Sequence, residues 1–560
     1  MAAVVAAGVL ILFAIGYRTW ARFVGERIYD DREEIETPAH VYEDGQDFVP
    51  TNRHILLGHH FTSIAGAAPI IGPCVAAYWG WLPAILWVVL GTIFMGAVHD
   101  FGALVASVRE KGRSIADITG VVLNERTRVM FLCFVLVLSW LVLAVFAIAI
   151  AGLFVSVPTS VLPINIEIVV AIGIGWLIYK KRVPALVPSL AALTVLYLFV
   201  WIGTKVPLSF ADLGLSAEAS STTWIVLLFA YSSVASLLPV WLLLQPRDYI
   251  NSHQLVVGLT LLFAGLFVVS PDFAAPALRT GGAGAPPIFP LLFVTIACGA
   301  ISGFHGLVSS GTTSKQLSSL RDARMIGYGA ALGEGSLALA ATMTAVAGIA
   351  VAGLDWNATF QTFGHMPGTK VFVLGGSAFL EAIGLSVEIA TTLMAVLVIS
   401  FAATTLDTAT RIERFIVCEL GSALRVRLLE NKVVATAIAI VPAIALATLK
   451  VPDAGGQVKL AGMVLWPIFG ASNQMLAALT LMVLSLYFHR RGRNVLPLVI
   501  PMLFVMAITL IALFLKAREF IGQSDWLLLG ITATQLTLVV WMIVEGFAMV
   551  AARRRDRAAE

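Results

Sequence analysis

Two adjacent histidines, His59 and His60, stand in the stretch GHHFTSIAGAAPIIGP at residues 58–73, inside an otherwise apolar part of the chain. Histidine exchanges protons near neutral pH, and ionisable groups within apolar spans usually serve a function. Either side chain is therefore a candidate for coupling proton movement to a substrate. The alternative is that each one hydrogen-bonds a neighbouring backbone carbonyl.

Acidic residues inside apolar runs are the second candidate set for proton chemistry. Glu334, Glu381 and Glu388 lie in such runs, as does Asp100. Glu381 and Glu388 are seven residues apart, so on one continuous helix they would share a face with Gly384. We expect Glu334, Glu381 or Glu388 to carry a proton, or else to be fixed by hydrogen bonds to neighbouring helices.

The histidine stretch should also interrupt a helix, because Gly66, Pro69 and Gly72 leave backbone groups without partners inside the helix. A half-helix that begins there directs free N–H groups and a positive dipole end toward a carboxylate. A second interruption is expected near Pro239, in YSSVASLLPVWLLLQPRDY. The candidate substrate-binding residues are Ser63, Gly66, Pro69, Gly72, Tyr231, Ser232, Ser233 and Ser236.

A stripe of polar side chains is expected on one helix face in the run 288–311 and just beyond it. Its members follow at spacings of three, four and three residues, and Ser310 adds a further hydroxyl. The stripe comprises Ser302, His305, Ser309 and Thr312. Hydroxyls can bind a coupling ion such as sodium, and helix–helix hydrogen bonding explains the same stripe equally well.

Charged residues near the ends of three apolar runs predict ion pairs that act as gates or fix the helix bundle. They are Asp100, Arg247, Asp248, Asp407 and Arg411. The chain has no HExxH motif and no close cluster of carboxylates, so we expect no bound metal. We expect no cofactor other than a coupling ion, either a proton or sodium.

The composition defines what must position these residues. The 560 residues are 59% hydrophobic and 12% charged, with a mean hydropathy of +0.92, so the chain is an all-α, polytopic membrane protein. We count about fifteen spanning helices. They are 3–20, 53–78, 80–108, 129–153, 165–179, 184–203, 222–246, 253–270, 288–311, 327–353, 376–403, 433–449, 458–487, 495–515 and 525–550.

Basic residues separate between alternate loops. One set of loops holds 29 of the 36 Lys and Arg residues, which predicts an N-terminus outside and a C-terminus in the cytoplasm of a bacterial or archaeal inner membrane. No basic, aromatic-interleaved stretch suggests nucleic-acid binding. The partners we expect are the lipid bilayer and a small-molecule substrate.

The two expected interruptions lie five spans apart, so the interrupted helices should run in opposite directions, as in an inverted repeat. This divides the chain into six parts. They are an extra N-terminal helix (1–25), an acidic cytoplasmic loop (26–52), a first five-helix repeat (53–203), a second repeat (222–403), four additional helices (433–550) and a basic tail (551–560).

Six motifs carry a family resemblance. They are DGQDFVPTNRHILLGHHFTSIAGAAPIIGP, GAVHDF, LPVWLLLQPRDY, FPLLFVTIACGAISGFHGLVSSGTTSKQ, LDTATRIERF and LWPIFGASNQMLA, between residues 44 and 477. The chain resembles the carbon starvation protein A family. The resemblance implies a transporter of the amino acid, polyamine and organocation superfamily, with the five-plus-five fold of leucine transporters. It also implies uptake of peptides during carbon starvation or of pyruvate with protons.

The leading hypothesis is a secondary active transporter that imports short peptides or pyruvate on a proton or sodium gradient. No ATP-binding loop is visible, which disfavours primary transport. The alternative is a membrane nutrient sensor with the same fold. An intramembrane enzyme would need a nucleophile or metal set that the sequence does not display, so we expect no enzyme.

Overall fold

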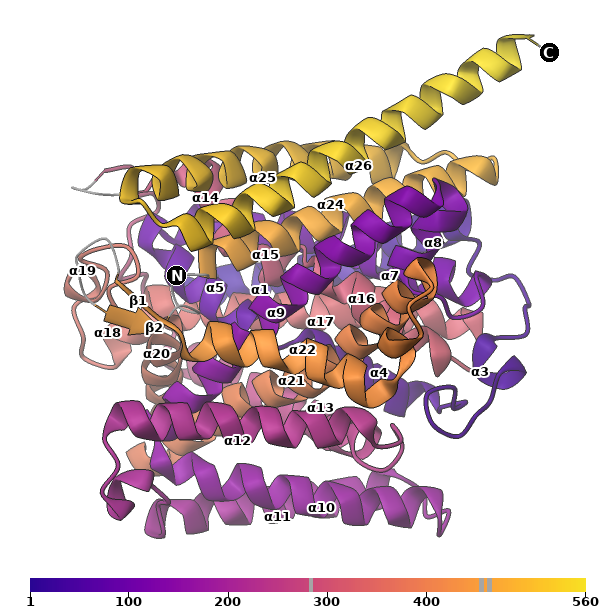
Figure 1. The fold of residues 1–560 in the computed structure, drawn as a ribbon. Helices are drawn as coiled ribbons and strands as arrows, with labels where there is room; N and C mark the ends of the chain where they lie inside the picture. Colours follow the sequence, from indigo (N-terminus) through magenta and orange to yellow (C-terminus); the bar gives the residue numbers. More distant parts are fainter. Residues whose placement is uncertain (282–285, 453–457, 461–465, 560) are drawn as a thin grey trace.

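The computed structural model describes residues 1–281, 286–452, 458–460 and 466–559, and most of this chain is helical (Figure 1). The helices are α1 (Ala2–Gly16), α2 (Arg22–Val24), α3 (Pro38–Val41), α4 (Arg53–Ile64), α5 (Ala68–Ala76), α6 (Trp81–Gly91), α7 (Ala97–Arg109), α8 (Ile115–Val122), α9 (Glu125–Ser156), α10 (Val161–Tyr179), α11 (Leu186–Lys205), α12 (Ala217–Leu237), α13 (Leu244–Val269), α14 (Ile288–Thr295), α15 (Ala297–Ala300), α16 (Gly303–Gly311), α17 (Ala330–Met343), α18 (Ile349–Val351), α19 (Trp356–Thr359), α20 (Gly368–Ala382), α21 (Val387–Leu424), α22 (Lys432–Thr448), α24 (Trp466–Arg490), α25 (Leu496–Gln523) and α26 (Trp526–Ala559). Two short antiparallel strands, β1 (Lys450–Pro452) and β2 (Val458–Leu460), join α22 to α24.

Within the described residues, twelve helices are long and apolar enough to cross a membrane, and the bent pair α4–α5 makes a thirteenth. Two of the predicted spans do not meet this measure. The run 288–311 is divided among α14, α15 and α16, and 433–449 is the 17-residue helix α22. The structure therefore supports twelve to thirteen spanning helices rather than about fifteen. Residues 461–465 of the predicted span 458–487 lie outside the described part.

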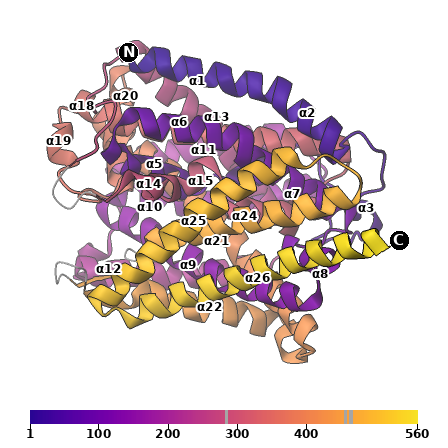
Figure 2. The same ribbon diagram turned by 90° about the horizontal axis from the view of Figure 1, so that it is seen from above.

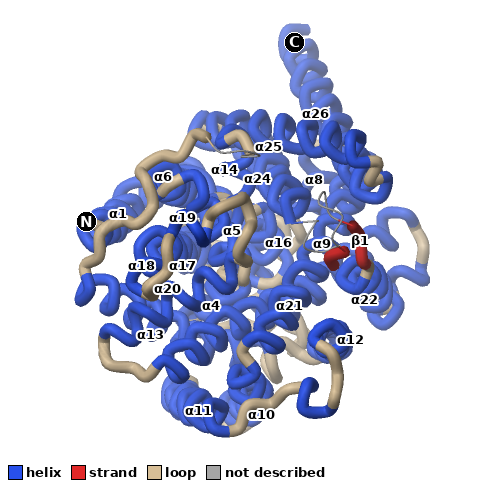
Figure 3. The backbone as a smooth tube through the Cα atoms, turned by 90° about the vertical axis from the view of Figure 1, so that its left-hand side faces the viewer, coloured by secondary structure: helices blue, strands red, loops and turns tan. Residues whose placement is uncertain are grey.

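The long helices α9 and α21 pack against each other in the middle of the molecule. In the most apolar stretch of each helix, 78% of the residues of α9 and 89% of those of α21 are buried. In α10 and in α11 the share is only 39%. Figures 1 and 3 show α10 and α11 as an outer layer on one face, with α25 and α26 on the opposite face. A helix that is apolar all round belongs inside a bundle, which is where α9 lies.

The predicted first interruption is confirmed. Helix α4 ends at Ile64 and α5 begins at Ala68, with a bend of 45° between the two segments. Pro69 sits in the first turn of α5, where a proline has no intrahelical hydrogen bond to lose. Gly72 lets α5 approach a neighbouring backbone, because an added Cβ would lie 2.4 Å from the carbonyl oxygen of Thr295.

The predicted second interruption near Pro239 is wrong. Helix α12 is an unbroken helix that ends at Leu237, and α13 begins at Leu244. Leu238 is extended, with φ −72° and ψ 152°, as the residue before a proline should be. Pro239 therefore ends one helix and does not divide a single span.

The second interrupted span lies instead at 288–311. Ile296 leaves the helical conformation after α14, and Ile301 and Ser302 are extended before α16 begins. This interrupted helix packs against the first one, because α5 contacts α15 and a Cβ at Gly299 of α15 would lie 3.3 Å from the Pro73 ring of α5. Two interrupted helices do meet in the bundle, but the partner of α4–α5 is α14–α16.

The predicted shared face of Glu381 and Glu388 is also wrong. Glu381 is in the last turn of α20, and Glu388 is in the first turn of α21. Between them Gly384 adopts a positive φ of 100°, and the Ser386 side chain caps the start of α21. Glu388 is exposed, so the two acids belong to a turn between helices rather than to the buried bundle.

Two of the basic loops meet the acidic segment 26–52 at one end of the molecule. Ion pairs connect the acidic segment 26–52 to residues of other loops, namely Arg321 with Glu34 at 2.5 Å, Arg324 with Asp31 at 2.7 Å and Arg493 with Asp30 at 2.6 Å. Burial raises the pKa of Asp31 despite its pairing with Arg324. The N-terminus and the end of α26 lie at opposite ends of the helices (Figures 1 and 2).

Candidate functional site

His60 of α4 is held between α7 and the turn that follows α16. Its Nε2 lies 2.9 Å from Oδ2 of Asp100, and its Nδ1 lies 2.8 Å from the hydroxyl of Thr313. Ser309 donates a hydrogen bond to the other carboxylate oxygen of Asp100. All four side chains are buried. Asp100, which was predicted to form a gate-like or bundle-fixing ion pair, therefore pairs with a histidine.

His305 and Glu334 continue this cluster away from His60. Nε2 of His305 lies 3.0 Å from Oε2 of Glu334, and Nδ1 of His305 lies 4.0 Å from Oδ2 of Asp100. Both side chains are buried, and Oε1 of Glu334 has no hydrogen-bond partner. Four helices thus supply one buried histidine–carboxylate cluster: α4, α7, α16 and α17.

His59 points into a different neighbourhood from His60. Its Nδ1 lies 2.5 Å from Oδ2 of Asp248 on α13, and its Nε2 lies 3.4 Å from the hydroxyl of Thr312. Gln316 also contacts the Nε2 atom of His59, at 3.3 Å. The two adjacent histidines therefore belong to two separate polar clusters, each with its own aspartate.

Arg247 of α13, the chain neighbour of Asp248, forms a third buried cluster. Its Nη1 donates hydrogen bonds to Asp407 and, at 2.7 Å, to the hydroxyl of Tyr231. Its Nε donates to Glu167 of α10 at 3.3 Å, and Ser400 donates to Glu167 at 2.9 Å. Two carboxylates thus surround one guanidinium, so the predicted charged pair of Arg247 exists but includes an acid that we did not predict.

Arg411 of α21 ties three segments together near the loop end. It donates to Asp47 at 2.8 Å and to the carbonyl oxygens of Ala235 and Leu238 at the end of α12. Its partner is therefore Asp47 in the acidic loop, not the neighbouring Asp407 of the same helix. Three backbone N–H groups hold the pKa of Asp44, in the same loop, below its ordinary value despite partial burial.

Side chains of α21 close the first interruption. The hydroxyl of Thr405 donates to the carbonyl oxygen of Ser63 at 3.1 Å, and the Ser63 hydroxyl lies 3.2 Å from that of Thr408. A Cβ at Gly66 would lie 2.7 Å from the Thr405 hydroxyl. Carbonyls freed at the end of α4 thus have partners on α21, and this structure holds the interruption in a closed, tightly packed state.

Asn473 of α24 provides hydrogen-bond partners for the second interruption. Its side-chain oxygen accepts a hydrogen bond from the backbone N–H of Phe304 at 2.8 Å, and its Nδ2 donates to Ser302 at 2.9 Å. Ser302 lies before α16 and not within it. The predicted continuous stripe is therefore divided, since Ser302 belongs to the interruption while His305, Ser309 and Ser310 share α16.

The predicted serines of the α12 region do not face an interruption. Ser232 and Ser233 donate hydrogen bonds to the carbonyl of Phe229, and Ser236 donates to that of Ser233, all within α12. Helical serines commonly bond to the preceding turn in this way. Tyr231 is the exception, because it donates to Asp407 at 2.8 Å in the Arg247 cluster.

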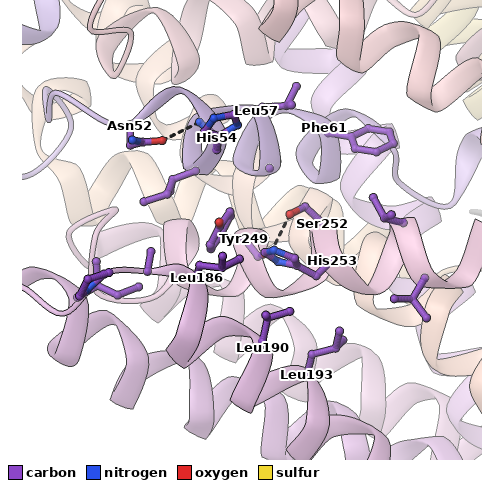
Figure 4. Close-up of a pocket in the computed structure, with 17 residues that line it drawn as sticks. Asn52, His54, Leu57, Phe61, Leu186, Leu190, Leu193, Tyr249, Ser252 and His253 are labelled. Carbon is purple, nitrogen blue, oxygen red and sulfur yellow. Dashed lines mark hydrogen bonds between the residues drawn. The ribbon is translucent and has the colours of Figure 1, made fainter.

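A cavity of about 780 Å³ lies between α4, α11 and α13, away from both interruptions (Figure 4). Asn52 and His54 stand at one end of it, and Leu190, Leu193 and Phe61 line the rest. Its lining is almost wholly apolar, and none of the predicted substrate-binding residues contributes to it. This cavity was not predicted.

Several residues of the clusters escaped the sequence analysis. Glu167 could have been found, because it is an acid within the apolar run 165–179. Gln316 carried no such signal, since polar residues near loops are common. Asn473 lies inside the predicted span 458–487, where an amide suggests packing or cavity lining, and Thr313 ends the hydroxyl-rich run SSGTT at 309–313. Within the described residues, no group of three or more His, Cys, Asp and Glu side chains is arranged to hold a metal ion.

These features define a polytopic helical membrane protein with two interrupted helices in contact and three clusters of buried, paired charges. The chain matches the carbon starvation protein CstA family over residues 1–365 and 354–512. It belongs to that family.

Two curated relatives and one solved structure illustrate the match. The "Peptide transporter CstA" of Mycobacterium tuberculosis is 32% identical over 92% of this chain and 74% of its own length. The "Pyruvate/proton symporter BtsT" of Escherichia coli is 35% identical over 60% of this chain and 47% of its own. A manganese transporter of Eremococcus coleocola, solved with an aromatic bis-isothiourea compound, has a TM-score of 0.50 at 12% identity, covering 90% and 99% of the two chains, a similarity of fold alone.

Proposed function

We propose that this protein is a secondary active transporter of the inner membrane that imports small carboxylate-bearing nutrients, either short peptides or pyruvate. The observation that carries the proposal is the contact between two interrupted helices, α4–α5 and α14–α16, inside a bundle of spanning helices. Irregular backbone inside a membrane is tolerated where it serves a binding site. The names of the relatives support a transport role and both classes of substrate.

An inverted repeat is supported by how the helices pair. We assign α4–α5, α6–α7, α9, α12 and α13 to one repeat, and α14–α16, α17, α21, α22 and α24 to the other. Counterparts contact each other: α5 with α15, α6 with α17, α9 with α21, and α12 with α22. The fifth elements pack equivalently, α13 on α4 and α24 on α16. The outer helices α10 and α11 then form an insertion, and the second repeat begins at residue 288 rather than 222.

The two interrupted helices run in opposite directions under this assignment. The chain reverses its direction at each crossing of the membrane. Six helices long and apolar enough to cross lie between the two interrupted helices, from α6–α7 to α13, so the second interrupted helix runs opposite to the first. The nine-residue half-helices α5 and α16 then direct their amide ends toward the contact between the interruptions. We place the substrate carboxylate at the start of α5, beside Ser63 and Gly66, once Thr405 of α21 moves aside.

Competition with an uncharged substrate analogue tests this site. In proteoliposomes we expect uptake of labelled pyruvate to be inhibited by unlabelled pyruvate about ten times better than by pyruvamide. Hydrogen bonds to a charged group contribute roughly 1.5–3 kcal/mol, which corresponds to tenfold or more in affinity. Alanylalanine and its amide provide the same comparison for peptides. Equal inhibition by acid and amide would contradict a carboxylate site at the half-helix.

Counterflow distinguishes a transporter from a sensor. A transporter exchanges labelled substrate outside the vesicle for unlabelled substrate inside, without any ion gradient. A sensor with the same fold would bind either compound and show no exchange. We expect exchange of at least one of the two substrates.

A further inference from the structure

The histidine–carboxylate cluster of α4, α7, α16 and α17 forms a series of proton-exchanging groups, with one separation longer than a hydrogen bond. Starting from the loop end, the series runs from the Thr313 hydroxyl to His60 (2.8 Å), Asp100 (2.9 Å), His305 (4.0 Å) and Glu334 (3.0 Å). Each residue comes from a different helix or turn, so the series exists only in the folded bundle. It ends beside the second interruption, because α17, which carries Glu334, packs against α15.

The series is incompletely hydrogen-bonded at its inner end. Both ring nitrogens of His305 and Oε1 of Glu334 are buried without a hydrogen bond of good geometry. His99, adjacent to Asp100 on α7, is likewise buried with both ring nitrogens unpaired. Buried polar groups are almost always satisfied, so unsatisfied ones at a functional centre call for an explanation. A proton that resides at different positions at different stages of a cycle provides one.

We propose that this series conducts the coupling proton, and that the coupling ion is therefore H⁺ rather than Na⁺. The inference rests on the proposed transport function and deepens it. Glu334 accepts the proton at the interruption, where substrate and ion enter together. His60 releases it toward Thr313, at the end of α16 that meets the basic loops.

Each transfer balances one bond broken with one bond formed. The Glu334 O–H bond breaks as an N–H bond forms at Nε2 of His305, and the proton at Nδ1 of His305 then passes to Asp100. The 4.0 Å separation of His305 from Asp100 exceeds a hydrogen bond, so this step needs a rotation of the His305 side chain. Asp100 finally passes its proton to Nε2 of His60. The Nδ1–H bond of His60 then breaks as the Thr313 hydroxyl oxygen takes that proton and gives up its own to water at the loop end.

The titratable groups that face the series are few. His99 lies beside Asp100 and His305, and Cys298 lies beside Glu334. His59 is the next residue to His60, but its partner is Asp248 in the other cluster. When one member of the series is removed, we therefore expect no neighbouring acid or base to take its place.

The test separates proton coupling from substrate exchange. Purified wild-type protein, Glu334→Gln and His305→Gln are placed in proteoliposomes with labelled pyruvate and labelled alanylalanine. We expect each variant to lose at least about tenfold of the accumulation driven by a pH gradient while retaining counterflow, since a missing proton carrier commonly costs that much or more. The pH dependence of uptake should flatten in the same variants. Glu43→Gln, the same substitution at an exposed loop position, is the matched control and should behave as wild type.

The outcomes are distinct. Gradient-driven accumulation that survives in both variants, or wild-type accumulation that follows a sodium gradient and ignores pH, overturns the proton series while leaving transport intact. A wild-type protein that neither accumulates nor exchanges either compound overturns the proposed function itself. If Glu334→Gln also loses counterflow, His305→Gln and Asp100→Asn provide the comparison instead, because both variants keep the Glu334 carboxylate.

Discussion

Single charged residues inside this bundle are stabilised by specific partners. Arg247 is 1% exposed and contacts both Asp407 and Glu167. Removing one partner of such a buried set leaves uncompensated charge, which costs far more than the intact set contributes. Residues that would be intolerable alone in a membrane are thus accommodated in groups.

Substitution of Arg247 tests this at the residue scale. Arg247→Met should destabilise the folded protein by about 3–5 kcal/mol, because Asp407 and Glu167 lose their shared cation. The measurement is the apparent melting temperature of detergent-purified protein. The matched comparison is the double variant Arg247→Met with Asp407→Asn, which should recover part of the loss. A double variant less stable than the single one would show that the pair does not compensate charge.

The sequence identified most charged members of these clusters but few of their partners. His59, His60 and Asp100 were predicted because an ionisable group in an apolar run is unusual. Their pairing was not predictable, since His59 meets an aspartate 189 positions away and Arg411 pairs with Asp47 rather than with Asp407. Contacts of this kind depend on which helix faces which, and one sequence does not encode that locally.

The two interrupted helices illustrate the same limit at the scale of elements. The first interruption was found from Gly66, Pro69 and Gly72. The second was misplaced at Pro239, because a proline is the strongest local sign of a helix break while the true one lies in ACGAISG, residues 297–303. Asn473 of α24 stabilises this break, because it accepts a hydrogen bond from the backbone N–H of Phe304 and donates one to Ser302. A break stabilised by a distant helix leaves little trace in its own residues.

The contact between the interruptions depends on the absence of a side chain at Gly72. Gly72→Ala places a Cβ within 2.4 Å of the Thr295 carbonyl oxygen, so α5 must move away from α14. We expect a lower apparent melting temperature and at least severalfold slower uptake. Gly173→Ala on α10 is the control, because no atom lies within 4 Å of its added Cβ. Equal behaviour of the two variants would mean that close packing at Gly72 is unimportant.

For the whole molecule, the ion pairs among loops confirm that the acidic segment and two of the basic loops share one end. The separation of basic residues predicts that this end faces the cytoplasm. Thiol labelling in intact cells tests the assignment with single cysteines at two exposed loop positions, Asp212→Cys and Arg427→Cys. An impermeant maleimide should label position 212 directly and position 427 only after permeabilisation, relative to the parent protein with its native cysteines. The reverse pattern would invert the orientation.

The sequence of the acidic segment 26–52 is typical of a solvated connector. In the structure, however, Asp47 of this segment accepts a hydrogen bond from the buried Arg411 of α21, which also donates to a carbonyl oxygen at the end of α12. Any rearrangement that admits solvent from that side must either carry the segment along with α21 or pull the carboxylate off the guanidinium. The second route leaves the buried Arg411 guanidinium without its carboxylate partner. The connector consequently contributes to the barrier to exposing the interior there, together with the helices it joins.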